Sequence, residues 1–342
     1  MAPSAPGDRV AVVVNGNARR VTEDLVEILD ELVKSGDLFV SRSLEEGQDI
    51  AKRIVNRDFR TVLTGGGDGT FTQMVTWVTR EARAQGKEPP RFGLLKLGTG
   101  NALAWVLGSG QARTAVADLA RVRTEGGTRT LRLLDVEGTL SPFAGLGAGA
   151  LALEHFEAIK PRLGAVPGVG RYLTGGVSHA LAITTGAAPE VLRQAPGRVR
   201  IVNRGAPATR LDEDGQPAGP PIATGAVLYD GTMRGVVAST IPYWGFGARI
   251  FPFAEEREDR FHLRVVDLGP AQVARHLRRI WRGTYRARGV HDFLVDAVHV
   301  QADGPTPLEI GGDFAGRRES VELRLSEEPI RVVDYYAPPP VS

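Results

Sequence analysis

The stretch TVLTGGGDGTFTQMV, residues 61–75, places three consecutive glycines, an aspartate and a fourth glycine directly after a short apolar run. Apolar residues at helical spacing resume at Met74, Val75 and Val78. The pattern therefore predicts a buried strand, a glycine turn and a helix. Such a turn leaves backbone N–H groups unobstructed at the positive end of a helix, which suits phosphate oxygens. A tight strand-to-helix turn without a ligand is the alternative.

Two other stretches repeat this arrangement. The segment LLKLGTGNALA, residues 94–104, passes from an apolar run through glycines to a helical pattern, and VVVNGNAR, residues 12–19, places Asn15 and Gly16 after another apolar run. In a parallel sheet, the loops that follow neighbouring strands share the carboxyl edge, where ligands bind. We therefore expect the loops to form one phosphate cradle.

The order of patterns predicts the fold class. Continuous apolar runs, beginning with Val10 to Val14, alternate with helical spacing from residue 8 to about residue 130. This order favours a doubly wound parallel sheet of the α/β class. Beyond about residue 133, short alternating runs separated by turns indicate a mainly antiparallel, β-rich domain. We predict an α/β domain at 1–132, a β-rich domain at 133–325 and a tail at 326–342.

Composition narrows the class of protein. The 42 basic and 40 acidic residues give a net charge of +2, which does not indicate a nucleic-acid partner. The absence of cysteine excludes disulfides and thiolate metal sites and indicates the cytoplasm. The most apolar stretch, residues 144–153, is shorter than the ~20 residues that a spanning helix requires. Any membrane contact is therefore expected at the surface.

The glycine motifs together resemble one family. NGNAR at 15–19, GGGDGT at 65–70 and LGTGN at 97–101 are similar to motifs of the diacylglycerol kinase catalytic domain family, which includes bacterial lipid kinases and sphingosine kinases. The resemblance extends from Val10 to about Val333 and includes IPYWGFGARIFPFA at 241–254. GGGDGT alone also occurs in NAD kinases and phosphofructokinase-like enzymes, whereas its combination with LGTGN is more specific.

The resemblance implies an activity and a set of site residues. It implies transfer of the γ-phosphate of ATP to a lipid hydroxyl with Mg²⁺ as cofactor, catalysis by the β-rich domain, and a tail that returns to the first domain. By position, the nucleotide-binding residues would be Asn15, Ser43, Gly66, Gly67, Asp68, Gly69, Thr70, Gly98, Thr99, Gly100 and Asn101.

Three acidic residues are candidates for the chemistry. Asp68 is a catalytic candidate whose carboxylate could bind magnesium, accept the proton of the attacking hydroxyl or stabilise its own turn. Asp313, in EIGGDFAG at 309–316, stands where relatives carry the glutamate of an Asp-Gly-Glu turn, and we expect it to accept the hydroxyl proton. An ordinary β-turn aspartate is the alternative for Asp313. Glu258 aligns with a metal-associated acid, and a solvated charge run, EEREDR, is the alternative.

One basic segment bears on access to lipid. Residues 271–289 place Val273, Leu277, Ile280, Trp281 and Tyr285 at helical spacing among six arginines. Such a helix could lie peripherally on an anionic membrane. The alternative is a core-packed amphipathic helix with a solvated basic face.

Three functions are compatible with these features. The leading prediction is a lipid kinase with a diacylglycerol-like or sphingosine-like acceptor, because Ala102 after LGTGN resembles the sphingosine kinase version. An NAD kinase-like phosphotransferase is disfavoured, since Thr72 and Gln73 replace the Asn-Glu pair. A nucleotide- or lipid-binding protein with impaired catalysis is the third possibility, because the acidic positions depart from the family pattern.

Overall fold

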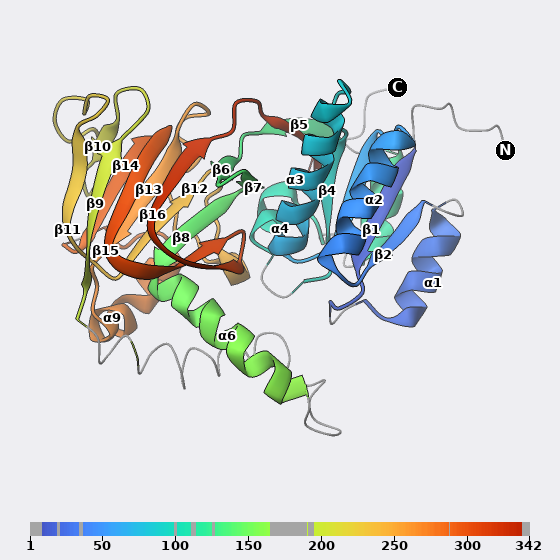
Figure 1. The fold of residues 1–342 in the computed structure, drawn as a ribbon, viewed down its shortest axis with the longest axis horizontal. Helices are drawn as coiled ribbons and strands as arrows, with labels where there is room; N and C mark the ends of the chain where they lie inside the picture. The colour runs from blue at the N-terminus through green and yellow to red at the C-terminus, as the bar shows by residue number, and fades with distance from the viewer. Residues whose placement is uncertain are drawn as a thin grey trace. The chain divides into compact units, whose positions relative to one another are not determined.

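The structure, a computed structural model, describes residues 9–18, 21–33, 37–98, 101–110, 114–124, 127–164, 190, 195–286 and 288–336. The protein forms two compact units. The first comprises Met1–Leu131 and Glu328–Ser342, and the second comprises Arg132–Glu327. Figure 1 shows both units as a ribbon and labels most of their helices and strands.

The first unit is built on a six-stranded sheet in the order β2-β1-β3-β4-β17-β5, in which only β5 is antiparallel to its neighbour. Its strands are β1 (Val10–Asn15), β2 (Leu38–Ser41), β3 (Thr61–Gly66), β4 (Arg91–Lys96), β5 (Gly127–Leu131) and β17 (Ile330–Asp334). Its helices are α1 (Glu23–Leu32), α2 (Leu44–Asn56), α3 (Asp68–Ala84), α4 (Ala102–Leu107) and α5 (Ala115–Thr124).

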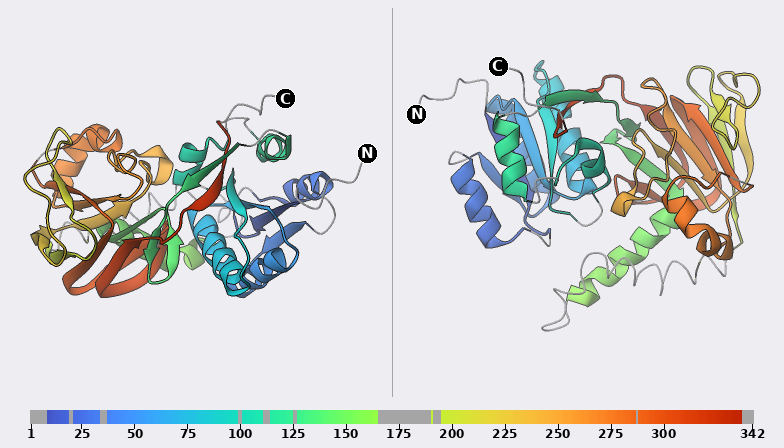
Figure 2. Two further views of the ribbon diagram at one scale, coloured as in Figure 1. Left: turned by 90° about the horizontal axis from the view of Figure 1, so that it is seen from above. Right: turned by 180° about the vertical axis from the view of Figure 1, so that it is seen from behind.

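Burial on both faces explains the continuous apolar strands of this sheet. Ala11 to Val14 in β1 are fully buried, as expected for a parallel strand covered on each side. Helix α2 packs beside α3 and α1 beside α5, and the two pairs cover opposite faces of the sheet (Figure 2). The chain end contributes β17 between β4 and β5, so this sheet contains the last described strand.

The second unit is an eleven-stranded, antiparallel assembly in which β10-β14-β13-β12-β8-β15-β16-β6-β7 form a continuous path and β9 joins β11 to β15. Its strands are β6 (Leu134–Val136), β7 (Thr139–Ser141), β8 (Phe143–Gly147), β9 (Gly197–Asn203), β10 (Thr209–Leu211), β11 (Val227–Met233), β12 (Gly235–Ser239), β13 (Phe261–Val266), β14 (Val290–Val295), β15 (Ala297–Ile310) and β16 (Asp313–Leu325). Its described helices are α6 (Ala148–Gly164), the 3-10 turn η2 (Gly245–Gly247) and α9 (Pro270–Trp281).

One apolar core joins these strands. Alternate residues such as Phe261, Leu263 and Val265 of β13 are fully buried and pack with Val298 and Val300 of β15. The predicted fold class, a doubly wound parallel sheet followed by an antiparallel β-rich part, is confirmed. Among the described residues, the structure has no helix whose length and hydropathy would allow it to span a membrane.

Candidate active site

Three of the predicted loops leave the same edge of the first sheet. Strands β1, β3 and β4 are neighbours and run parallel. Asn15 is the last residue of β1, and Gly67 and Gly98 follow β3 and β4, so all three lie at the carboxyl edge of the sheet. Asn15 donates a hydrogen bond from Nδ2 to Oγ1 of Thr70 at 3.3 Å. The structure therefore brings the first loop against the start of α3.

The loop that follows β3 and the loop that follows β4 touch each other through glycines. A Cβ at Gly98 would lie 2.7 Å from the carbonyl oxygen of Gly66 and would overlap the backbone of Gly67. A Cβ at Gly66 would lie 2.8 Å from the Cβ of Thr70. Gly66 and Gly98 are thus required by close packing within the first unit.

Gly67 has no such structural requirement. Its φ of −95° is accessible to any residue, and a Cβ there would meet no atom of the described residues within 4 Å. Gly67 is also the N-cap of α3, a 17-residue helix whose first N–H groups have no partner inside the helix. The open side of Gly67 therefore lies at a helix end that favours anions such as phosphate.

Asp68 connects the two glycine loops. The side chain is 7% exposed, and its two oxygens accept hydrogen bonds from the backbone N–H groups of Ala102 at 2.7 Å and Leu103 at 3.0 Å. Burial raises the pKa of the Asp68 carboxyl to about 6, while the two amide hydrogen bonds act in the opposite direction. Both oxygens are engaged, so the geometry favours a role in holding the start of α4.

Asn101 supplies an acceptor that lacks a described partner. The residue adopts the left-handed region, with φ 37° and ψ 62°, and its Nδ2 donates to the carbonyl oxygen of Gly98 at 2.6 Å. Its Oδ1 is buried, and no donor among the described residues reaches it. A buried acceptor of this kind favours a ligand donor or an ordered water. Thr99 and Gly100, predicted in the same loop, lie outside the described residues.

Ser43 has a local role at the second strand. Its hydroxyl accepts a hydrogen bond from the N–H of Glu46 at 3.1 Å and caps α2. Serine is a preferred N-cap because its oxygen satisfies one of the free N–H groups of the first turn. The predicted nucleotide-binding residue is therefore an exposed helix cap at the carboxyl end of β2.

Asp313 lies at a hairpin in the second unit. Gly311 and Gly312 connect β15 to β16 with φ values of 62° and 86°, and Ile310 pairs with Asp313 across the turn. Positive φ at both central positions is typical of a type I′ hairpin turn, which glycine adopts without strain. Gly311 occupies the first central position of this turn, where the family pattern has an aspartate. The Asp313 side chain is exposed.

Sequence reasoning missed Glu309, four residues before Asp313. Glu309 is 1% exposed and its Oε1 accepts a hydrogen bond from Nε1 of Trp244 at 3.2 Å. No described residue bonds its Oε2. Burial raises the pKa of the Glu309 carboxyl to about 8. The available signal was an acidic residue inside the apolar stretch PLEIGG, at residues 307–312.

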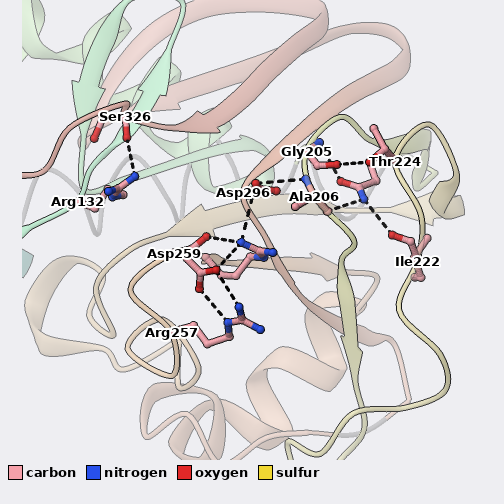
Figure 3. A network of polar contacts seen from close by, with 11 residues as sticks. Arg132, Gly205, Ala206, Ile222, Thr224, Arg257, Asp259, Asp296 and Ser326 are labelled. Carbon is pink, nitrogen blue, oxygen red and sulfur yellow. Dashed lines mark hydrogen bonds and ion pairs between the residues drawn. The ribbon is translucent and has the colours of Figure 1, made fainter.

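Glu258 is exposed in the connection that precedes β13. Its neighbour Asp259 accepts hydrogen bonds from Arg257 at 2.9 Å and 2.8 Å (Figure 3). Within the described part of the chain, no three His, Asp or Glu side chains are grouped in a way that could hold a metal ion. The metal role of Glu258 thus stays a prediction.

One family model and several solved structures are similar to this chain. The family model of the diacylglycerol kinase catalytic domain matches residues 9–136. None of the curated proteins matches the chain. A solved structure described as "a putative diacylglycerol kinase from Bacillus anthracis str. Sterne" is similar with a TM-score of 0.64 and 14% identity, over 96% of this chain and 98% of that one.

Two further solved structures from the same organism are similar. One carries the same description and has a TM-score of 0.61 and 14% identity, over 95% of this chain and 96% of that one. The other, described as a diacylglycerol kinase, has a TM-score of 0.57 and 13% identity, over 96% and 97% of the two chains. At this identity the likeness shows the fold. The resemblance to the diacylglycerol kinase catalytic domain family is confirmed, and residues 9–136 carry the match to its domain.

Proposed function

We propose that the protein is an ATP-dependent lipid kinase that transfers the γ-phosphate to a lipid hydroxyl. The observation that carries the proposal is the free space at Gly67, at the N-terminus of α3 and beside the loop of Gly98. The proposed phosphate-binding set comprises Asn15, Gly66, Gly67, Gly69, Thr70, Gly98, Thr99, Gly100 and Asn101, with Ser43 at the neighbouring strand. We propose that Asp68 acts in this site by positioning the α4 loop.

The chemistry requires mainly positioning and charge neutralisation. A bond forms between the lipid hydroxyl oxygen and the γ-phosphorus, and the bond from that phosphorus to the bridging oxygen of ADP breaks. The hydroxyl proton passes to a carboxylate, for which exposed Asp313 is the proposed acceptor. Mg²⁺ would neutralise phosphate charge when bound, chiefly through phosphate oxygens and water, with Glu258 as the proposed protein ligand.

Access to lipid is proposed to use α9. Leu277 is 54% exposed and Trp281 is 44% exposed, although both are large apolar residues. The segment from 270 to 289 contains six arginines and no acidic residue. Exposed apolar groups beside arginines suit the surface of an anionic membrane. The alternative, an amphipathic helix that packs its apolar side chains into the core, does not apply to Leu277 or Trp281, because both are largely exposed.

A phosphoryl-transfer assay tests the function. The purified chain is incubated with γ-labelled ATP, Mg²⁺ and diacylglycerol, sphingosine, monoacylglycerol or NAD in separate reactions. We expect label on a lipid, and we expect Asp313→Asn to lower the rate about 10²-fold, as for loss of a general base. Asp303→Asn is the matched control, because Asp303 is an exposed aspartate of β15. Absence of label on every lipid contradicts the proposal.

The same assay addresses the other candidate functions. An impaired nucleotide-binding protein is favoured by one observation, the replacement of the family's first turn carboxylate by Gly311. It would bind ATP and label no acceptor. An NAD kinase-like enzyme would label NAD in preference to lipid.

A further inference from the structure

The second unit contains a cavity that the proposed kinase chemistry does not use. It has a volume of about 780 Å³ and lies where β10, β11 and β14 meet the first turn of α9. This volume falls in the range of small-molecule sites, ~300–1,000 Å³. All of its lining residues belong to the second unit.

Three arginines, Arg210, Arg286 and Arg288, line this cavity. Among the described residues, none of the three has a carboxylate within ion-pair distance. The guanidinium of Arg286 stacks over the Phe253 ring at 4.7 Å, and its Nε is buried with no acceptor in the described part of the chain. Three guanidinium groups in one cavity are thus available to an anion.

The most buried acid of the cavity is already neutralised. Asp292 accepts hydrogen bonds from Nε of Arg264 at 2.7 Å and from Nη2 at 3.0 Å, and its Oδ1 lies 2.8 Å from Nε2 of His262. Burial opposes ionisation of Asp292, but Arg264 and His262 hold its pKa well below the usual range. Asp292 is therefore an ionised partner of Arg264, and it forms no ion pair with the three cavity arginines.

The other lining acids also have local partners or face solvent. Asp267 accepts a hydrogen bond from Oγ1 of Thr232 at 2.6 Å. Asp212 accepts the backbone N–H groups of Asp214 at 2.9 Å and Gln216 at 2.8 Å, and so fixes its own turn. Glu213, the remaining acid, is exposed. Asp212 and Asp267 thus accept local hydrogen bonds, whereas none of the three cavity arginines forms an ion pair with a described carboxylate.

One wall of the cavity is aromatic. The rings of Tyr229 and His291 are 4.9 Å apart and inclined at 46°. Burial, followed by the charge of Arg210, lowers the pKa of His291. Arg210 lines the same cavity as these two rings, so aromatic surface and a guanidinium group are available to one ligand.

We propose that this cavity binds a phosphate ester, with its phosphate oxygens on Arg210, Arg286 and Arg288 and its organic part against Tyr229 and His291. Guanidinium groups suit this anion because their planar N–H donors match phosphate oxygens in pairs. The ester could be a soluble molecule or the headgroup of a phospholipid. The proposal does not rest on phosphoryl transfer. Arg286 and Arg288 belong to the basic segment 270–289, whereas Arg210 lies outside it, so Arg210→Gln separates the cavity from the membrane contact proposed for that segment.

Two binding measurements on the full chain separate these sources. Equilibrium dialysis measures glycerol 3-phosphate, and vesicle sedimentation compares phosphatidylcholine vesicles with and without phosphatidic acid. Both are repeated with Arg210→Gln and Arg288→Gln, which alter exposed arginines, and with Arg204→Gln, an exposed arginine outside the cavity, as the matched control. Thermal unfolding confirms that each variant is folded.

We expect each cavity variant to weaken binding about tenfold, equivalent to ~1.4 kcal/mol, while Arg204→Gln binds as the wild type does. Binding of glycerol 3-phosphate with this pattern identifies a soluble ester. The same pattern only with phosphatidic acid vesicles identifies a lipid headgroup. The proposal is overturned if neither probe binds, or if both cavity variants bind as tightly as the control.

Discussion

At the scale of single residues, Glu309 makes stability depend on pH. Its folded pKa of about 8 lies above the ordinary value of 4.5, so the folded state retains a proton that the unfolded state loses. The contribution to stability is complete below pH 4.5 and decreases as the pH rises to about 8. Glutamine has the same shape and cannot ionise.

We predict that Glu309→Gln is more stable than the wild type at pH 9 by a few kcal/mol, since one pKa unit corresponds to ~1.4 kcal/mol. At pH 4 the two proteins should be nearly equal. Urea unfolding at both pH values measures this difference, with Glu319→Gln, an exposed glutamate of β16, as control. An equal difference in unfolding free energy at pH 4 and pH 9 would contradict the raised pKa of Glu309.

Asp68 holds the loop that contains Gly98 and Asn101, through its hydrogen bonds to the start of α4. Asparagine keeps one acceptor but directs an NH₂ donor at the N–H of Ala102 or Leu103. We predict that Asp68→Asn destabilises the first unit by ~1–3 kcal/mol at pH 8, the usual effect of leaving a buried group unsatisfied. Denaturant unfolding measures this loss. Asp303→Asn should show no loss, and a stable Asp68→Asn would refute the capping role.

At the scale of elements, the apolar runs were sufficient to predict β1, β3 and β4 of the first sheet, whereas β5, with the sequence GTRTL, has no apolar run. The continuous apolar runs at Val10–Val14 and Thr61–Leu63 indicate strands that are covered on both faces, because buried parallel strands are apolar on both faces. The site was less predictable. The motif indicated a glycine turn at Gly67, but the contact between Asp68 and the start of α4 depends on side-chain direction, which spacing does not determine. Glu309 was missed because a single acid in a strand has no periodic signal.

Helix α9 carries two exposed apolar side chains that are proposed to contact the membrane. Trp281 and Leu277 are largely exposed, so replacing both with alanine should leave the midpoint of thermal unfolding unchanged. It should weaken sedimentation with anionic vesicles about tenfold or more, since each buried CH₂ contributes ~0.8 kcal/mol. Ile28→Ala, at a residue of α1 that is 45% exposed, is the control. Unchanged sedimentation of the double variant would rule out α9 as the membrane contact.

At the scale of the whole molecule, the last described strand stabilises the first sheet. Val332 is fully buried in β17, between β4 and β5. We predict that Val332→Ala destabilises the first unit by ~1–3 kcal/mol through lost burial and a residual cavity. Val227→Ala, at a valine that is 40% exposed on β11, should have little effect. Equal effects of the two substitutions on urea unfolding would contradict the role of β17.

Phosphate binding by the loop of Gly67 is tested most directly by the ATP affinity of Gly67→Ala. A Cβ at Gly67 would meet no described atom, and alanine at the N-cap of α3 costs ~1 kcal/mol or less, so the variant should remain folded. A methyl group there would occupy the space over the start of α3, and isothermal titration should show an ATP dissociation constant raised about tenfold or more. Gly304→Ala is the matched control, because its Cβ would also meet no described atom within 4 Å. Wild-type affinity in a folded Gly67→Ala would contradict the proposal that this loop binds the phosphates.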